Sequence, residues 1–337
     1  MKTLAVWISL LFLVSAPMCS AQIAFTPQRP DTIFADTVKV GIALSGGAAK
    51  GFAHLGVLQA LDEAGVRIDV VSGTSMGAIM GMFYCAGYSP REILAIAKKE
   101  HMDDRKTILR NNHKRDAGYA DYRHLRRVFY KYVPHNSFDS LSTKFYCCAV
   151  DINNACAKHV GEGGYLAQYV TASAAFPVVF APVVIEGVTY VDGGVMVNLP
   201  VEPLIWEGCD IRIGSYFDDE SHIDKFNNRK EIWMRSFSLL ITANTVDRVL
   251  FCTHPVKIDP HGYSQIDFEQ IDNWFQYGYE AGQKLLSDHP ELRQHTRLLK
   301  NPIIDHKAPL DKLLRRLDFN RKLIDRFSFR KNNHNEK

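Results

Sequence analysis

The hydrophobic pattern of the chain is clearest over residues 38–72. Residues 38–44 form an apolar run, which predicts a buried strand. Apolar side chains recur every three positions in residues 52–64, as in an amphipathic helix, and Gly65 supplies a C-terminal stop. Residues 68–72 form the next apolar run. This order of strand, helix and strand predicts a βαβ unit with parallel strands and a right-handed crossover.

The pattern beyond residue 72 predicts further helices and strands. Residues 76–87 are small or apolar on all sides, as in a buried helix. Ser89-Pro90-Arg91-Glu92 has the N-cap, proline and capping-box glutamate of a helix start. We expect strands over 144–150, 156–160 and 211–216, a hairpin around Glu186-Gly187, and helices over 124–132, 165–175, 232–251 and 271–286.

Residues 1–21 have the pattern of a secretory signal peptide. Lys2 gives a positive charge, residues 4–14 are apolar, and small residues precede Gln22. The apolar run is too short to span a bilayer, and a buried first helix is the alternative. We therefore expect export to a periplasm or secretion, with membrane association as a further option. Residues 22–37 form a polar lead-in that contains prolines.

Composition narrows the classes of function. The chain is 46% hydrophobic and 23% charged with a net charge of +3, which is typical of a globular protein. It has no basic-aromatic motif and no zinc-ligand spacing, so we expect neither nucleic acid nor a metal ion as a ligand. Export would permit disulfides. Buried free thiols are favoured, because Cys147 and Cys148 are adjacent in an expected strand and point to opposite faces.

The chemistry centres on Gly73-Thr74-Ser75-Met76-Gly77. Gly-x-Ser-x-Gly between an apolar run and a helix is the layout of a nucleophile elbow, where a serine sits on a sharp strand-to-helix turn. We expect Gly73 and Gly77 to be glycines because a side chain would collide with backbone in so tight a turn. The pattern predicts Ser75 as a nucleophile.

A serine nucleophile also needs a site for the developing oxyanion and a base. Residues 45–51 are glycine-rich, follow the first strand and open a helix, so their backbone N–H groups are candidates for an oxyanion hole. The loop lacks the Gly-Lys-Ser/Thr end of a nucleotide-binding P-loop. Asp192, followed by two glycines at the end of an expected strand, is the candidate base, although an acid there can be a turn former. His54 is expected to have a packing role on its own helix.

Four ordered blocks together resemble the patatin-like phospholipase family, the exported bacterial relatives of patatin and of the neuropathy target esterase catalytic domain. The blocks are Gly41–Gly51, Gly73–Gly77, Ala172–Pro177 with Phe180 and Pro182, and Tyr190–Gly194 with Asn198–Val201. They cover about half of the chain. The resemblance implies a three-layer α/β/α fold with a mainly parallel central sheet.

The family uses a Ser–Asp dyad without histidine or a cofactor, which implies Ser75 as the nucleophile and Asp192 as the base. It implies an oxyanion hole from the backbone N–H groups of Gly46, Gly47, Ala48 and Met76. Supporting positions are Lys50, Gly51, Gly193 and Gly194. Two residues depart from the family: Ala48 replaces a glycine and Lys50 an arginine. Alanine is tolerated at a backbone donor unless a positive φ is required.

The resemblance implies a lipid acyl hydrolase that acts on phospholipids or lysophospholipids. A histidine-triad carboxylesterase and a non-catalytic lipid-binding module on the same fold are the alternatives. We expect the catalytic core over residues 38–220, a mainly helical extension packed on it over 221–310, and a basic amphipathic tail over 311–337. The basic stretch 100–122 and the tail are candidates for peripheral membrane contact.

Overall fold

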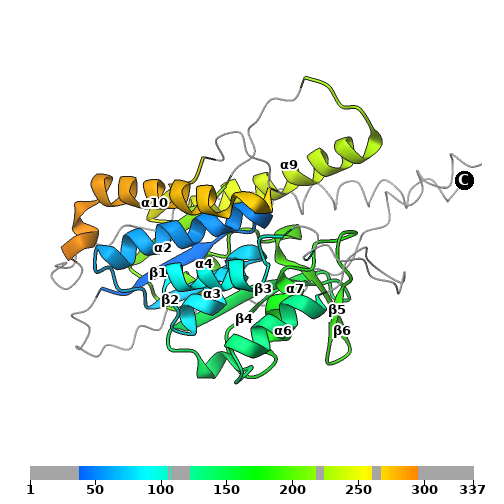
Figure 1. Ribbon diagram of the computed structural model, residues 1–337, viewed down its shortest axis with the longest axis horizontal. Helices are drawn as coiled ribbons and strands as arrows, with labels where there is room; N and C mark the ends of the chain where they lie inside the picture. Colours follow the sequence, from blue (N-terminus) through cyan, green and yellow to red (C-terminus); the bar gives the residue numbers. More distant parts are fainter. Residues whose placement is uncertain (1–37, 105–106, 108–121, 218–223, 260–266, 295–337) are drawn as a thin grey trace, which may run out of the picture.

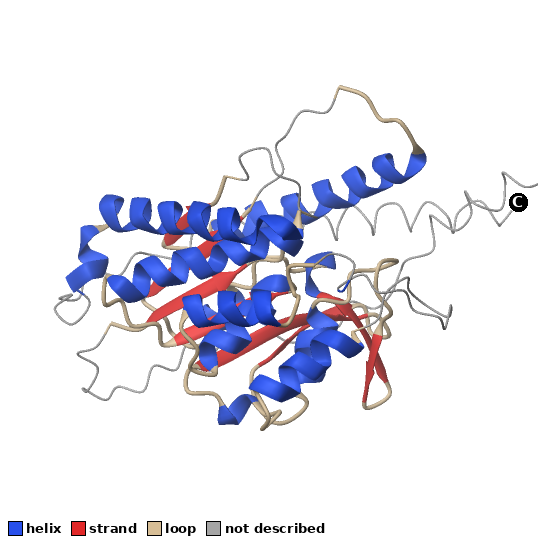
Figure 2. Ribbon diagram, viewed as in Figure 1, coloured by secondary structure: helices blue, strands red, loops and turns tan. Residues whose placement is uncertain are grey.

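The structure is a computed structural model that describes residues 38–104, 107, 122–217, 224–259 and 267–294. These residues form a central sheet with helices on both faces (Figures 1 and 2). The strand order is β5 (Val183–Ile185), β6 (Val188–Asp192), β3 (Lys144–Asp151), β2 (Val70–Thr74), β1 (Val40–Leu44), β7 (Ile211–Tyr216) and β8 (His254–Lys257), with β4 (Cys156–Val160) paired to β3. Strands β3, β2, β1, β7 and β8 are parallel, whereas β4, β5 and β6 pair antiparallel. The three-layer α/β/α fold with a mainly parallel sheet is confirmed.

The helices follow the order of the sequence. They are α2 (Ala53–Glu63), α3 (Met76–Cys85), α4 (Pro90–Lys99), α6 (Arg123–Tyr132), α7 (Leu166–Ser173), α8 (Glu202–Trp206), α9 (Arg229–Val249) and α10 (Ile271–Asp288), with short 3₁₀ turns that include η1 (Ala48–Phe52), η3 (Gly193–Val195) and η5 (Pro290–Gln294). The expected capping box forms at Ser89 and Glu92, and the expected hairpin at Glu186-Gly187 joins β5 to β6. The hydrophobic pattern therefore predicted most of these elements within a few residues.

Successive residues of a strand face different layers, which builds two cores. Ile42 and Leu44 of β1 belong to the large core that includes side chains of α2, α3 and α10. Ala43 between them belongs to a smaller core on the other face, with Leu204 of α8. This alternation is the period-2 geometry of a strand that is covered on both faces.

The strand register brings β6 to the end of β2. Residues 144–148 of β3 pair with β2, and Thr74 lies opposite Cys148. The next residue of β3, Ala149, pairs with Asp192 of β6. Strand β4 pairs with residues 147–151 along one edge of β3. Strand β6 therefore pairs along the same edge of β3 as β2, beyond the point where β2 ends at Thr74. Asp192 is therefore placed directly beyond Thr74, where Ser75 begins its turn.

The expected helical extension also completes the sheet. Strand β8, which the hydrophobic pattern did not predict, pairs with β7 at the edge of the sheet. It is only four residues long, contains Pro255 and buries one side chain, Val256, so it gives almost no periodic signal. Helix α10 packs along α2, and a Cβ at Gly278 would overlap the Ala53 carbonyl.

Cys85, Cys147, Cys148, Cys156, Cys209 and Cys252 are free thiols, as expected, and four of them are buried. The predicted signal peptide, the lead-in, most of the basic stretch 100–122 and the amphipathic tail lie outside the described residues. Among the helices that are described, none has the length and apolar character needed to cross a bilayer.

Candidate active site

Ser75 lies on a strained turn between β2 and α3. Its backbone has φ 55° and ψ −123°, a region that non-glycine residues rarely occupy and that costs about 1–3 kcal/mol. A Cβ at Gly73 would come within 2.5 Å of the Gly77 carbonyl oxygen, and a Cβ at Gly77 would overlap the Leu44 carbonyl. The expected steric role of both glycines is therefore confirmed.

Hydrogen bonds from distant segments hold this turn in place. The Ser75 N–H donates to Ser173 Oγ of α7 at 3.0 Å, and the Ser173 hydroxyl donates to the Cys148 carbonyl of β3 at 2.5 Å. The hydroxyl of Thr74 donates to the carbonyl of Val197 at 2.8 Å. Hydrogen bonds from α7, β3 and the segment after η3 thus hold the strained backbone of Ser75 in place. The sequence analysis did not single out Ser173 as a support, because these contacts span about 25 to 120 positions along the chain.

Asp192 ends β6 as a buried carboxylate that is 2% exposed. Its Oδ1 accepts a hydrogen bond from the Gly194 N–H at 2.8 Å, and its own N–H donates to the Ala175 carbonyl. Its Oδ2 is buried and accepts no hydrogen bond of good geometry. Burial raises the pKa of Asp192 to about 7, against the lowering effects of the Gly194 N–H and of the nearby Ser75 hydroxyl. The carboxylate is therefore a much stronger base than an ordinary aspartate.

Tyr122 contributes to this desolvated environment. It is 2% exposed, its ring stacks on Phe180 with a centroid separation of 4.4 Å, and its hydroxyl donates to the Ala174 carbonyl. Burial raises the pKa of Tyr122, and the charge of Asp192 adds to that effect. The apolar segment ahead of Asp192 was expected to desolvate the carboxylate, whereas Tyr122, from a polar stretch of sequence, was not.

The glycine-rich loop approaches the elbow from β1, and it corrects one predicted donor. The Gly46 N–H donates to the Asn198 carbonyl at 3.1 Å, so it is already used within the protein and is unavailable to an oxyanion. Gly46 is buried, whereas Gly47 and Ala48 are half-buried. Gly46 still lies against the elbow, because a Cβ there would come within 3.1 Å of Ser75 Cβ. The candidate donors of this loop narrow to Gly47 and Ala48, with Met76 at the start of α3.

Ala48, which replaces a glycine of the family, adopts φ 49°. The position therefore does require the positive φ that alanine tolerates poorly. The alanine therefore carries some backbone strain that a glycine would not. Gly51 closes the loop against the elbow, since a Cβ there would overlap the Met76 side chain. Lys50 Nζ lies 5.6 Å from the centre of the Phe217 ring, in the geometry of a cation–π contact. Gly193 must likewise lack a side chain, because a Cβ there would overlap the Cys148 carbonyl.

His54 is buried beneath the loop, where both of its ring nitrogens are hydrogen-bonded. One ring nitrogen lies 2.8 Å from the Ser45 carbonyl oxygen, and the other lies 2.8 Å from Ser215 Oγ. Burial lowers the pKa of His54 to about 4, so the ring is neutral at pH 7. The expected packing role is confirmed, with the addition that His54 ties the loop to β7. Within the described part of the chain, neither Ser75 nor Asp192 forms a hydrogen bond with a histidine.

Helix α9 is anchored to the loop that follows Asp192. Asn244 Oδ1 accepts from the Asn198 N–H at 2.9 Å, and Asn244 Nδ2 donates to the Gly194 carbonyl at 3.0 Å. Asn198 Nδ2 donates to Thr245 Oγ1 at 2.9 Å. Sequence reasoning missed Asn244 and Thr245, because the signal they give is that of an ordinary polar pair within a helix. The supposed extension thus helps to position the site.

A family model for patatin-like phospholipases matches residues 42–205, the part of the chain that contains β1, the elbow and Asp192. These residues, about half of the chain, form a domain of the patatin-like phospholipase family. It is 27% identical over 276 residues to the Lysophospholipase NTE1 of Kluyveromyces lactis, covering 73% of this chain and 19% of the relative. It is also 27% identical over 279 residues to the Lysophospholipase nte1 of Aspergillus terreus, covering 73% and 18%. The chain therefore spans about a fifth of the length of these relatives.

Among solved structures, VipD from Legionella pneumophila is similar to this chain. The alignment covers 76% of this chain and 67% of VipD, with 16% sequence identity and a TM-score of 0.45.

Proposed function

We propose that this protein is a serine acyl hydrolase in which Ser75 and Asp192 form a catalytic dyad. The observation that carries the proposal is the pairing of a strained serine with a buried carboxylate whose pKa is raised to about 7. A general base is most effective when its pKa lies near the working pH. Membership of a family of lipid hydrolases supports the same reaction class.

In the proposed first half-reaction, Ser75 Oγ attacks the carbonyl carbon of a fatty acyl ester while Asp192 takes the hydroxyl proton. The oxyanion faces the N–H groups of Gly47 and Ala48, with Met76 as a further donor. The intermediate then collapses, the C–O bond of the ester breaks, and the alcohol leaves with the proton from Asp192. An acyl-Ser75 ester remains.

In the second half-reaction, a water molecule gives a proton to Asp192 and attacks the acyl carbon. The second tetrahedral intermediate uses the same backbone donors. It releases the fatty acid as Ser75 Oγ takes the proton back from Asp192. This cycle needs only the side chains of the dyad and water, and both return to their starting state.

Phospholipids or lysophospholipids are the proposed substrates. The two fungal relatives are named as lysophospholipases, which supports this class of substrate. The position of helix α9 supports a lipid surface as the place where the enzyme works. Among the α9 side chains that the structure describes, only Thr245 is buried, and Ile232, Trp233, Leu239, Leu240 and Val246 are exposed apolar side chains.

We propose that the exposed part of α9 rests on the bilayer that supplies the substrate. Phe237 of α9 contacts Phe176 edge to face at 5.0 Å and stacks with Trp233 at 5.6 Å, and Phe176 follows the residue whose carbonyl binds the Asp192 N–H. The apolar surface is thus continuous with the site. Residues 229–249 also carry four basic and two acidic side chains, which favours anionic lipids.

Trp233→Ala should weaken co-sedimentation with phosphatidylglycerol vesicles, while hydrolysis of a soluble ester is retained. Trp206→Ala is the matched control, because Trp206 is 56% exposed against 40% for Trp233 and lies outside α9, at the end of α8, where its ring contacts His159 of β4. Equal vesicle binding by both variants would contradict the role of α9 without touching the dyad.

A fluorophosphonate probe tests the dyad directly. Wild-type protein should be labelled at Ser75, as mapped by peptide mass spectrometry, and Ser75→Ala should not be labelled. A non-catalytic lipid-binding module would give no label and no ester hydrolysis. A histidine-triad esterase would be labelled, but Asp192→Asn would retain near wild-type turnover.

We further propose that the protein is exported through residues 1–21, on the pattern described above. Cell fractionation with N-terminal sequencing should place a mature chain that begins at Gln22 outside the cytoplasm. Recovery of a cytoplasmic chain that begins at Met1 would contradict this proposal.

A further inference from the structure

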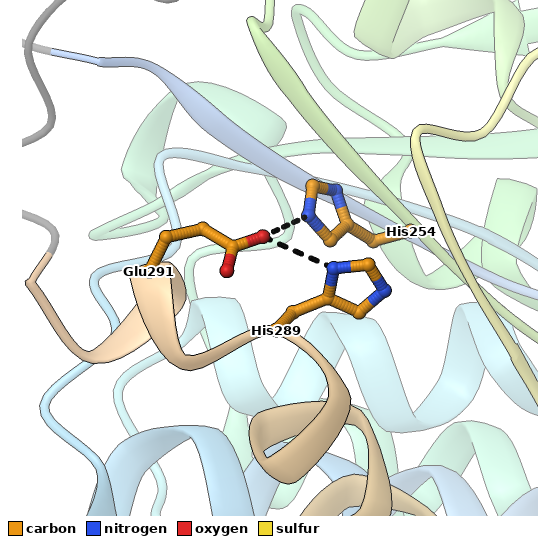
Figure 3. Close-up of side chains that lie close together, drawn as sticks. All are labelled: His254, His289 and Glu291. Carbon is orange, nitrogen blue, oxygen red and sulfur yellow. Dashed lines mark hydrogen bonds and ion pairs between the residues drawn. The ribbon is translucent and has the colours of Figure 1, made fainter.

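A second cluster of reactive side chains lies at the opposite end of the parallel strands from Ser75. His254 begins β8, whereas Ser75 follows the carboxyl end of the parallel strand β2. His289 caps the end of α10, and Glu291 lies in the following turn η5. Figure 3 shows a nitrogen of each imidazole turned toward one oxygen of Glu291. The dyad uses none of these three residues.

The distances from the Glu291 oxygen to the two imidazole nitrogens are close to those between ligands of one metal ion. Glu291 Oε1 lies 3.0 Å from His289 Nδ1 and 3.5 Å from His254 Nε2, and all three atoms lie within 4.8 Å of one another. Ligands bound at about 2.0–2.1 Å to a tetrahedral ion are about 3.3 Å apart. Small side-chain rotations would therefore bring the three atoms onto one ion.

The surroundings of His254 allow its Nε2 to direct a lone pair at the point between the three side chains. Its other nitrogen, Nδ1, lies 2.8 Å from Thr253 Oγ1. That hydroxyl accepts from the Arg212 N–H at 2.8 Å and lies 3.3 Å from the Arg212 carbonyl, so it can also accept the proton of Nδ1 in the tautomer that carries it there. In that tautomer, the lone pair of His254 Nε2 is directed toward Glu291 Oε1, 3.5 Å away. A hydrogen-bonded partner that fixes the tautomer of a histidine in this way is the usual arrangement behind a metal ligand.

In the tautomer with the proton on Nδ1, His254 and Glu291 turn two acceptor atoms toward one point, which a divalent ion can occupy. Two imidazole nitrogens and one carboxylate oxygen suit zinc and its transition-metal neighbours, whereas calcium and magnesium prefer oxygen ligands throughout.

We propose that His254, His289 and Glu291 bind one divalent transition-metal ion of the zinc type, with water as the fourth ligand. Side chains of His289 and Glu291 are 37% and 40% exposed, which leaves an open path for the ion and the water. Leu292 is fully buried and holds η5 against the core, so the ligands sit on fixed backbone. The ion would fasten the end of α10 to the edge strand β8, and its role would be structural.

The test uses the untagged full chain, stripped with a chelator and titrated with Zn²⁺ by calorimetry. We expect one ion per chain and a melting temperature that rises by several degrees with saturating Zn²⁺. His289→Gln and Glu291→Gln should each weaken binding at least tenfold and remove most of the thermal shift. The matched controls His135→Gln and Glu162→Gln change exposed residues elsewhere and should behave as wild type.

Two further measurements make the outcome decisive. The metal-free variants should melt at the temperature of metal-free wild type, which separates lost ligands from misfolding. Bound Co²⁺ should show the visible bands of a tetrahedral nitrogen and oxygen site. A thiolate-to-cobalt charge-transfer band would overturn the proposal in favour of the cysteines, as would Zn²⁺ binding that His289→Gln leaves unchanged. Absence of saturable binding to wild type would also overturn it.

Discussion

Asp151 and Asp192 end neighbouring antiparallel strands of the same sheet, yet their surroundings act in opposite directions. Both are nearly buried, at 6% and 2% exposure. Burial acts to raise the pKa of Asp151, but three hydrogen bonds from Asn153 and Asn154 outweigh it and the pKa is lowered. Asp192 receives one such bond from Gly194 and has its pKa raised to about 7.

The difference shows that burial alone does not make a carboxylate a base. The carboxylate of Asp151 is satisfied by donors that follow it in a tight turn, so its negative charge is stable. Gly193 and Gly194 follow Asp192, and a single backbone N–H donates to its Oδ1, while Oδ2 accepts no hydrogen bond and the Ser75 hydroxyl lies near the carboxylate. Asp151 has more hydrogen-bond donors, the nearby charge of Lys158 and a position closer to the protein surface, and these together separate it from Asp192.

The largest expected effect comes from exchanging the two carboxylates for amides. Asp192→Asn should lower kcat for ester hydrolysis by about 1,000-fold, since a positioned base contributes about 10²–10⁴. Asp151→Asn should keep kcat within a few fold of wild type and cost about 1–3 kcal/mol of stability, because a buried hydrogen-bond network is disturbed. Steady-state kinetics and urea unfolding measure the two quantities. Similar kcat values for the two variants would remove the distinction.

The two aspartates should also give opposite dependence of stability on pH. Asp192 has a raised pKa, so its contribution is full below the ordinary value of 3.8 and is lost as pH rises toward about 7. The loss is at most about 4 kcal/mol, at about 1.4 kcal/mol per pH unit. Asp151 has a lowered pKa, so its contribution is full above 3.8 and is lost as pH falls below that value.

Urea unfolding from pH 4 to pH 8 tests this contrast. Wild type should lose stability over that range relative to Asp192→Asn, which should be the more stable protein at pH 8. The acid limb of kcat/KM for wild type should bend near pH 7, because only the charged form of Asp192 accepts the proton of Ser75. A limb that bends near pH 4 would mean that the carboxylate is not desolvated in solution.

A smaller effect separates support of the elbow from general stability. Ser173→Ala removes the acceptor of the Ser75 N–H and should lower kcat about tenfold while costing about 1–3 kcal/mol. Thr171→Ala is the control on the same helix, since its buried hydroxyl donates to the Ala167 carbonyl within α7. It should lose stability with kcat unchanged, and equal losses of kcat in the two variants would contradict the supporting role of Ser173.

Local patterns were enough to predict the elbow and its glycines, because a tight turn imposes its requirements on adjacent residues. The role of Asp192 came from the family resemblance and from its place at a strand end. What sequence reasoning missed is non-local. The register that sets β6 beyond β2 joins residues that are far apart in the chain, and no periodicity encodes it.

The same limit explains the correction at Gly46. A glycine-rich loop was expected to offer all of its N–H groups, but the Asn198 carbonyl, about 150 residues away, already accepts the one from Gly46. Tyr122 and the anchors of α9 were missed for the same reason. Strand β8 was missed because a short edge strand with a proline has too little buried surface to leave a pattern.

The smallest expected effect concerns two alanines with positive φ, one in each of the compared regions. Ala48 has φ 49° in the proposed oxyanion loop, and Ala155 has φ 54° in the turn after Asp151. Replacing either by glycine removes about 1–2 kcal/mol of strain and adds about 0.5–1 kcal/mol of unfolded-state entropy cost, so each should gain up to about 1 kcal/mol.

Only Ala48→Gly should also change catalysis, by lowering kcat a few fold, because a glycine holds the proposed N–H donor less rigidly. Ala155→Gly should leave kcat unaltered while giving the same gain in stability. Thermal unfolding and steady-state kinetics on the pair would compare the two loops at matched backbone strain. If kcat responds equally at both positions, the strain at Ala48 has no special link to the oxyanion site.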